Sequence, residues 1–343
     1  MGWVETTDSV RVHPADSVIR ARGLARTFTT KSGPVEAVKG IDFDVHAGEI
    51  LGLLGPNGAG KTTTLRMIST LLAPTAGEAT VVGADLRTEP RIVRSRIGYV
   101  PQGGSTVDEH IVEEELVLQA RLFGLSKAEA RRSAAALYEA LGLEGLAGRT
   151  CGQLSGGQRR RVDIALGLVH RPTLIYLDEP TTGLDPQSRA NLWEHIRRLR
   201  GDGTTVVLTT HYLEEADALC DRILVMDHGG IVAMGTPDEL KRRISGDVIS
   251  LEIEDSDADL ALQVAESVLD VRQGIRADGD RTGRTGTALV HLTVERGDEA
   301  VVPLLRALDE KDITPGALTV KRPSLDDVFL SLTGRSLREG AQS

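Results

Sequence analysis

Apolar residues form several short, uninterrupted runs along the chain, and the clearest of them leads into a glycine-rich loop. Residues 50–54 contain no charged or hydrogen-bonding side chain, which predicts a strand that is buried on both faces. The loop 55–60 contains three glycines, and residues 61–72 then show the spacing of a helix. A strand, a glycine loop and a helix in this order are typical of the phosphate-binding unit of an α/β protein.

The α/β pattern continues on both sides of this unit. Predicted strands lie at 18–28, 37–45, 173–179 and 204–211, a helix lies at 188–200, and a hairpin at 222–235 turns at Gly229 and Gly230. Between them, residues 113–125 and 128–143 have the period and composition of helices. The segment of about 103–169 is therefore expected to be a helical subdomain inserted into the α/β domain.

A domain boundary is predicted near residue 245, so that 18–245 form the α/β domain. The remainder, 246–343, has the order strand, helix, strand, strand, helix, strand, which predicts a small ferredoxin-like α+β domain. Its strands are expected at 248–254, 271–277, 287–295 and 313–321, its helices at 258–269 and 298–311, and the loop of its central hairpin at 277–286. Residues 1–17 are polar and have no apolar signal core, so they are expected to form a flexible arm.

The composition narrows the choice of partners. The chain has 40 Lys and Arg against 50 Asp and Glu, and this net charge of −10 argues against nucleic acid as the main partner. The basic runs 159–161 and 241–243 are expected to be solvated helix faces. No apolar run approaches the ~18 residues that span a bilayer, so membrane-spanning segments would have to come from a partner. The two cysteines have no metal-ligand spacing, and free thiols suit a reducing cytoplasm.

The loop and the start of the helix fit the phosphate-loop pattern GxxxxGK[ST]. Its glycines let successive backbone N–H groups point at an anion, and the helix that follows adds the positive end of its dipole. Lys61 is expected to neutralise the β- and γ-phosphates of a nucleotide, and the hydroxyl of Thr62 is expected to bind Mg²⁺.

Polar residues that follow the other predicted strands complete this candidate site. Asp178 and Glu179 end an apolar strand and point to opposite sides, so Asp178 suits the Mg²⁺ shell and Glu179 suits a general base. Their alternative role is to cap a helix after a core strand. Gln102 could bind Mg²⁺ or position water, and His211 could contact the γ-phosphate. Phe28 could stack on adenine, but packing in the core would explain it equally well.

A second glycine turn lies at 154–158, Leu-Ser-Gly-Gly-Gln. Ser155 can cap the helix that follows, and the two glycines expose N–H groups. That helix is apolar at Val162, Ala165, Leu166 and Val169, so it should be packed and fixed in direction. Because a whole helical subdomain separates the two turns, we do not expect both to bind the same nucleotide.

The motifs GPNGAGKTT, YVPQ, LSGGQ, LIYLDEP, TTGLD and TTH occur in this order, and together they resemble the ATP-binding subunit of an ABC transporter. LSGGQ separates this family from other phosphate-loop proteins. The segments RRRVDIALGLVHRP, THYLEEAD and PSLDDVFLSLTGR are further similar to the daunorubicin/doxorubicin-resistance type of exporter ATPase. The likeness extends over nearly the whole chain after residue 17.

The resemblance implies a role for each matching residue. Glu179 would activate water, His211 would be the switch residue, and Thr62, Gln102 and Asp178 would arrange Mg²⁺. The phosphates of ATP would be held by Gly55, Pro56, Asn57, Gly58, Ala59, Gly60, Lys61, Thr62 and Thr63. Two chains would meet head to tail, so that Ser155, Gly156, Gly157 and Gln158 of each close on the ATP of the other. Asp185 would lie in the loop that joins the two sites, and Phe28 would take the adenine-stacking position, where the wider family usually has tyrosine.

The resemblance also implies partners: a separate multi-span permease, and a second copy of the chain or a paralogous ATPase, at the cytoplasmic face of the membrane. The acidic run 107–115 either docks a basic helix of the permease or supplies acids to a helix N-terminus. The terminal segment 323–335 either contacts the dimer or the permease, or packs on its own sandwich. The alternatives in function are an importer ATPase, a soluble ATPase that acts on nucleic acid or ribosomes, and a regulatory module with little turnover.

Overall fold

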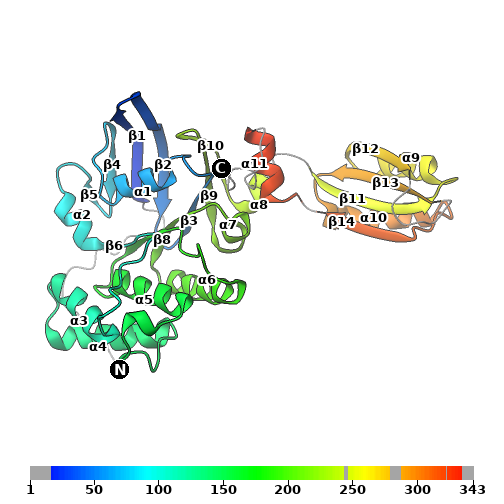
Figure 1. The fold of residues 1–343 in the computed structure, drawn as a ribbon. Helices are drawn as coiled ribbons and strands as arrows, with labels where there is room; N and C mark the ends of the chain where they lie inside the picture. The colour runs from blue at the N-terminus through cyan, green and yellow to red at the C-terminus, as the bar shows by residue number, and fades with distance from the viewer. Residues whose placement is uncertain (1–16, 243–245, 279–286, 322, 334–343) are drawn as a thin grey trace. The chain divides into compact units, whose positions relative to one another are not determined.

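The computed structural model describes residues 17–242, 246–278, 287–321 and 323–333. Most of the predicted arm at 1–17 and most of the predicted loop at 277–286 lie outside them, and Ser17 is the first residue of a strand. The chain divides into two compact units, Met1–Met234 and Gly235–Ser343 (Figure 1). The second unit thus begins before the predicted boundary near 245.

The first unit is built around a six-stranded sheet in which the phosphate-loop strand is central. The strand order is β10-β9-β3-β8-β7-β6, and β9, β3, β8, β7 and β6 run parallel to one another. The strands are β3 (Ile50–Leu54), β6 (Ile97–Val100), β7 (Leu174–Asp178), β8 (Thr205–Thr210), β9 (Arg222–Asp227) and β10 (Gly230–Gly235). Parallel strands bring their carboxyl ends to one edge of the sheet, which is where α/β proteins bind ligands.

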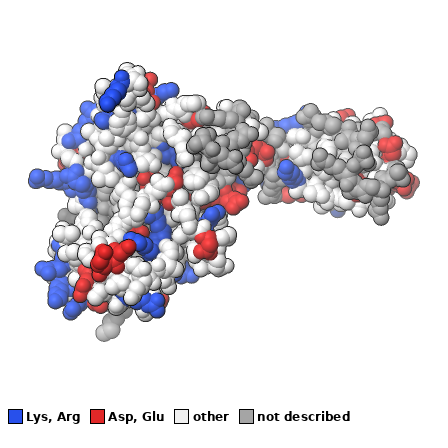
Figure 2. Space-filling model, in the orientation of Figure 1, with Lys and Arg blue, Asp and Glu red and all other residues white. Residues whose placement is uncertain are grey.

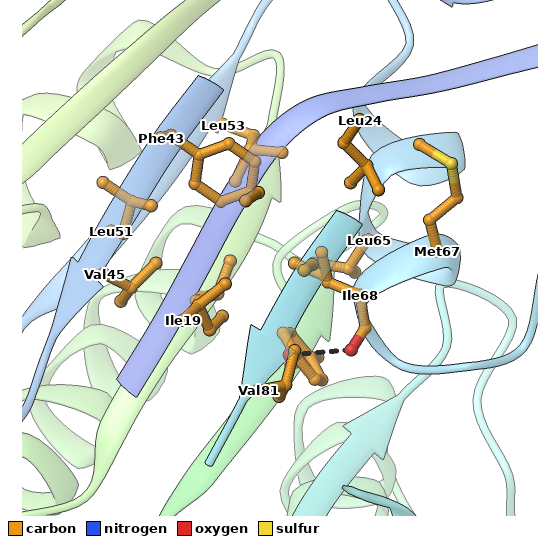
Figure 3. Close-up of a cluster of buried hydrophobic side chains, with 14 of the residues drawn as sticks. Ile19, Leu24, Phe43, Val45, Leu51, Leu53, Leu65, Met67, Ile68 and Val81 are labelled. Carbon is orange, nitrogen blue, oxygen red and sulfur yellow. Dashed lines mark hydrogen bonds between the residues drawn. The ribbon is translucent and has the colours of Figure 1, made fainter. Parts of the chain in front are cut away.

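An antiparallel sheet packs against this central sheet and encloses the core. Its order is β2-β1-β4-β5. The strands are β1 (Ser17–Thr30), β2 (Gly33–His46), β4 (Ala76–Val81) and β5 (Ala84–Asp85). Ile19 and Phe43 of this sheet, Leu51 of β3 and Leu65 of α1 (Lys61–Ile68) lie in one buried cluster (Figure 3). This core fixes α1, and with it the phosphate loop, between the two sheets.

The remaining helices of the first unit include the predicted helical segment. They are α2 (Pro90–Arg96), α3 (Val112–Leu122), α4 (Lys127–Ala140), the 3-10 turn η1 (Cys151–Gln153), α5 (Gly156–Leu168), α6 (Pro186–Gly201) and α7 (Leu213–Leu219). Helix α3 packs against α4 and α5 (Figure 1), and α5 also packs against β6 and β7. Helix α5 thereby joins the helical segment to the edge of the sheet where β7 ends.

The second unit contains the predicted ferredoxin-like arrangement. Its elements are α8 (Pro237–Arg242), β11 (Asp247–Glu254), α9 (Ala258–Val268), β12 (Val271–Asp278), β13 (Thr287–Val294), α10 (Gly297–Asp309), β14 (Ala317–Lys321) and α11 (Leu325–Thr333). The antiparallel order β12-β13-β11-β14 is that of a βαββαβ sandwich. The predicted fold class, an α/β core with a helical insertion and a small α+β domain, is confirmed.

Two local predictions need correction. The hairpin of β9 and β10 turns at His228 and Gly229, which both have positive φ (46° and 81°), rather than at Gly229 and Gly230. Helix α11 packs on α8 rather than on the sandwich, and it buries Leu325, Val328 and Phe329. Across the described residues, no helix is both long and apolar enough to cross a membrane.

Candidate active site

The phosphate loop lies between the end of β3 and the start of α1. Gly60 is the N-cap of α1, with φ 101°, and a Cβ atom there would lie 2.6 Å from the carbonyl oxygen of Ala37. Only glycine fits this position, because it needs both a left-handed backbone and the missing side chain. The loop therefore holds its curled form next to strand β2 of the antiparallel sheet.

Lys61 is a buried cation at the first position of α1. Its side chain is 5% exposed, and Nζ donates hydrogen bonds to the carbonyl oxygens of Gly55 (2.7 Å) and Pro56 (2.9 Å). Burial lowers the pKa of Lys61, while the charges of Glu179 and Asp178 act to raise it. A desolvated ammonium group inside the loop is suited to attract the oxygens of a phosphate chain.

Asp178 ends strand β7 and faces the start of α1. Its Oδ1 accepts hydrogen bonds from Thr62 Oγ1 (3.0 Å) and Thr209 Oγ1 (2.6 Å), and Tyr99 OH lies 3.5 Å from Oδ2. A threonine hydroxyl and a carboxylate oxygen thus meet at one point beside the phosphate loop. These are oxygen ligands of the kind that Mg²⁺ takes together with substrate phosphates, so the residues fit this ion.

Glu179 follows Asp178 but has a separate set of partners. Its Oε2 accepts hydrogen bonds from Gln102 Nε2 (2.8 Å) and Thr182 Oγ1 (3.0 Å). His211 Nδ1 lies 3.3 Å from Oε1, within ion-pair range but without the angle of a hydrogen bond. The nearby imidazole of His211 is the main cause that lowers the pKa of Glu179. Burial acts in the opposite direction, and the charges of His211 and Lys61 lower the pKa further. Glu179 is therefore ionised at neutral pH and able to accept a proton.

The backbone holds Glu179 in an uncommon conformation. Its φ is 44°, which is left-handed for a residue with a side chain, and its N–H donates to Thr209 Oγ1 (2.9 Å). The hydroxyl of Thr209 thus bridges the carboxylate of Asp178 and the backbone of Glu179. This turn of the backbone directs the two consecutive carboxylates to different partners.

Lys61, Thr62, Gln102 and Glu179 line an open cavity of about 680 Å³, which is large enough for a nucleotide, whereas Asp178 and His211 lie outside its lining. Its lining consists of Val35, Glu36, Ala37, Lys39, Asn57, Gly58, Ala59, Gly60, Lys61, Thr62, Thr63, Gln102, Glu179 and His228. Of these, Val35, Glu36, Ala37, Lys39 and His228 were not predicted from the sequence. Phe28 lies outside this lining, although its cross-strand partner Val35 belongs to it. The guanidinium of Arg26 lies 4.7 Å above the Phe28 ring.

The second glycine turn lies outside the cavity lining and opens to solvent. Ser155 is the N-cap of α5: its side chain accepts from Gln158 N (3.3 Å), and Gln158 Oε1 accepts from Ser155 N (3.0 Å). Ser155 and Gly156 are exposed. The predicted apolar positions of this helix, Val162, Ala165, Leu166 and Val169, are all buried. Asp185 is exposed and caps α6 by accepting from Ser188 N (2.9 Å), which lowers its pKa.

The expectation of a solvated arginine run at 159–161 is wrong. Arg160 is 7% exposed, and Arg159 and Arg161 are half-buried. The guanidinium of Arg160 donates to backbone carbonyls instead of facing water. The middle of α5 is buried nearly all the way round, because it lies between the other helices and the sheet. It therefore has no solvated face.

The acidic run 107–115 is only partly available to a partner. Glu115 is buried and accepts from Val107 N (3.2 Å) and Cys151 Sγ (3.1 Å). Asp108 pairs with Arg159 at 2.7 Å. Glu113 and Glu114 lie in the first turn of α3 and are exposed. Figure 2 shows acidic side chains gathered on the helical part of the first unit.

Comparisons with known proteins agree with this architecture. The ABC transporter family profile matches residues 38–182, and the profile of the C-terminal domain of DrrA1-3-like ATP-binding proteins matches 235–333. The chain is 42% identical to the daunorubicin resistance ATP-binding protein DrrA3 of Streptomyces coeruleorubidus, over 95% of this chain and 100% of that protein. It is 41% identical to the doxorubicin resistance ATP-binding protein DrrA of Mycobacterium tuberculosis, over 93% and 94%.

Two solved structures resemble the first unit. One is an ATP-binding subunit of an ABC transporter, with a TM-score of 0.59 and 30% identity, over 66% of this chain and 93% of that chain. The other is a dimeric ATP-binding cassette in a post-hydrolysis state with ADP and Pi, with a TM-score of 0.59 and 28% identity, over 64% and 98%.

Proposed function

The chain belongs to the ATP-binding subunits of ABC transporters, in the daunorubicin/doxorubicin-resistance type of exporter ATPase, and we propose that its ATP hydrolysis powers the efflux of a drug-like or lipophilic compound. The observation that carries the proposal is the convergence of Lys61, Thr62 and Glu179 on one nucleotide-sized cavity, with Asp178 hydrogen-bonded to Thr62 at its edge. The names of the two relatives described above, both resistance proteins, favour export over import. The export direction and the kind of compound rest on those relatives alone.

In this proposal each charged residue has one task. The amides of the phosphate loop and Lys61 bind the β- and γ-phosphates of ATP, and Thr62, Asp178 and Gln102 hold Mg²⁺. When it is bound, Mg²⁺ neutralises charge on the phosphate oxygens. Glu179 accepts a proton from the water that attacks the γ-phosphorus, and His211 contacts the γ-phosphate. The ionised state of Glu179 supports its role as the base.

We infer further that the complete site forms between two chains. The turn at Ser155 exposes the N-terminus of a buried, fixed helix, yet it lies outside the cavity that holds the phosphate loop. A second copy or a paralogous ATPase, bound head to tail, would bring its own turn to this cavity. A relative with 28% identity is a dimer with ADP and Pi. In this arrangement closure around two ATP molecules drives a separate permease, and hydrolysis loosens the dimer.

Ser155→Arg tests the shared site. It should leave ATP binding to a single subunit unchanged and abolish cooperative hydrolysis, because a long cation would block the turn that meets the partner's γ-phosphate. Ser126→Arg is the matched control: Ser126 caps α4 through the same kind of capping box, with Glu129 in place of Gln158. Loss of a cap costs about 1 kcal/mol at either position. Cooperative hydrolysis that survives Ser155→Arg would refute the shared site.

The permease itself is proposed to lie in the membrane, with this chain bound at its cytoplasmic face. Of the acidic run, only exposed residues can dock a basic helix, so the test uses Glu113→Lys with Glu114→Lys and leaves the buried Glu115 unchanged. If these acids dock the permease, the double variant should no longer co-purify with it. Unchanged co-purification would leave the acids their other role, which is to stabilise the N-terminus of α3.

A further inference from the structure

Arg160 connects helix α5 to two loops of the active site. Its Nη1 donates to the carbonyl oxygen of Pro101 (2.7 Å), directly before Gln102. Its Nε donates to Pro180 O (2.9 Å) and its Nη2 to Asp178 O (3.0 Å), on either side of Glu179. One buried side chain thus binds the backbone next to Gln102 and the backbone around Glu179.

Two neighbours on α5 hold the other end of the loop that carries Gln102. The carboxylate of Asp163 accepts from Ser105 N (2.6 Å) and Thr106 N (3.1 Å). Arg159 donates to Thr106 Oγ1 (2.8 Å) and Thr106 O (3.0 Å). The loop 101–106 is therefore attached to α5 at both ends, and Gln102 has to follow movements of this helix.

The chemistry of the guanidinium makes Arg160 suited to this connection. It presents five N–H donors in a rigid plane, so that it can bind several carbonyls in fixed directions, whereas lysine carries a compact point charge. Burial lowers the pKa of Arg160, and the nearby charges of Asp163, Asp178 and Glu215 oppose this. Because the side chain is buried and hydrogen-bonded to three backbone carbonyls, a shift of the helix should move these carbonyls with it.

We propose that Arg160 is a positioning residue that couples the nucleotide bound by the partner at the N-terminus of α5 to Gln102 and Glu179 of this chain's own site. Ser155 starts the same helix that carries Arg160 at its second turn, so one element contacts both nucleotides of the dimer. Engagement of the partner's nucleotide shifts α5, and Arg160 shifts the backbone on which the base and Gln102 are mounted. This inference rests on the shared site of the proposed function.

Arg160→Met tests the coupling, with Arg161→Met as the matched control. Arg161 lies on the same helix and also donates to backbone carbonyls, but those belong to Leu141 (3.2 Å), Gly142 (3.1 Å) and Gly157 (3.4 Å), and none of them to the loops that carry Gln102 and Glu179. The full-length chain is assayed for hydrolysis across ATP concentrations and for binding of a fluorescent ATP analogue. Arg160→Met should lower kcat by about tenfold and bring the Hill coefficient close to one, while nucleotide affinity changes less than about twofold. Arg161→Met should retain cooperativity.

Wild-type kcat and cooperativity in Arg160→Met would overturn the proposal. An equal loss of thermal stability, affinity and kcat in both variants would overturn it as well, because that pattern indicates a merely structural role. If Arg160→Met does not fold, Arg160→Lys decides: it keeps the charge but loses the planar fork, and it should reduce cooperativity in a folded protein. ATP-induced dimerisation of Glu179→Gln is measured separately. Its absence would refute the shared site itself rather than the role of Arg160 alone.

Discussion

Replacement of Glu179 by Gln should stop hydrolysis while the chain still folds and binds ATP. Glu179 is 8% exposed, and the neighbouring His211 lowers its pKa, so the carboxylate is ionised and can accept a proton at neutral pH. An amide cannot. General-base catalysis contributes about 10²–10⁴-fold to a rate, which corresponds to about 2.7–5.5 kcal/mol of transition-state stabilisation. We expect kcat to fall by this factor.

The same substitution should change stability little. Gln102 and Thr182 both donate to one oxygen of Glu179, and the amide oxygen of glutamine can accept both of these hydrogen bonds. Only the carboxylate oxygen that faces His211 is replaced, by the NH₂ group of the amide. The free energy of unfolding should therefore change by no more than about 1.5 kcal/mol, the net contribution of one hydrogen bond.

Two measurements check this prediction: steady-state release of phosphate, and size-exclusion chromatography with and without ATP. Slow hydrolysis should leave Glu179→Gln as a stable dimer when ATP is present. Glu214→Gln is the matched control, because it removes the same charge from an exposed position of α7. Turnover near the wild-type rate in Glu179→Gln would refute the role of Glu179 as the base. An equal loss of turnover in Glu214→Gln would show that the change in net charge, and not the loss of the base, slows hydrolysis.

Three further predictions concern buried polar groups. Thr209→Val should lower the free energy of unfolding by about 1–3 kcal/mol, measured by urea titration, because the backbone N–H of Glu179 loses its buried partner. Cys151 and Cys220 are buried and their pKa values are raised (that of Cys151 to about 12), so a thiol reagent at pH 8 should react with neither until the chain is unfolded. Burial also raises the pKa of Glu215, so the folded state loses stability as pH rises from the ordinary value of 4.5 through the raised value. Glu215→Gln should accordingly raise the Tm at pH 8 and not at pH 4, and an equal effect at both would contradict this.

Much of the fold could be predicted because its signals are local. The apolar run 50–54 is strand β3, with all five residues buried, and the βαββαβ order of the C-terminal segment gives its sheet. Element boundaries were less predictable. The strand expected at 313–321 begins at Ala317, because Ile313 lies in the turn that follows α10: its N–H donates to Leu308 O and its side chain is buried in the core. An apolar residue in a helix-terminal turn resembles the first residue of a strand.

The site was predictable where a motif carries the chemistry in consecutive residues, as in the phosphate loop. It was not predictable where the tertiary fold brings a residue in. Lys39 and His228 line the cavity because the turn of β9 and β10 bonds to β2 and to the phosphate loop, through Lys39 N to Gly229 O (2.8 Å) and Gly229 N to Ala59 O (3.1 Å). Arg160 was wrongly expected to face solvent. The helical period shows which face of a helix is apolar, but it does not show that backbone carbonyl groups surround a charged side chain.

Three charged side chains of the site, Lys61, Asp178 and Glu179, have hydrogen-bond partners within the single chain, and this affects both ATP binding and hydrolysis. Lys61 donates to loop carbonyls, Asp178 accepts from Thr62, and Glu179 accepts from Gln102. Each contact that Lys61 or Asp178 makes with MgATP therefore replaces an existing hydrogen bond, so that only the difference between the two interactions contributes to binding. The loop amides and the helix dipole add to this difference.

Hydrolysis also requires that the carboxylate of Glu179 can orient an attacking water. It has less capacity to do so while it accepts hydrogen bonds from Gln102 and Thr182. Gln102 is mounted on the loop that α5 holds through Arg160 and Asp163. Arg160 of the same helix also binds the carbonyls on either side of Glu179, so a displacement of α5 acts on the backbone of both residues and changes their contact. In the proposed shared site, a single chain would bind ATP with its base engaged by Gln102, and contact of the second chain with α5 at Ser155 would free the base for water.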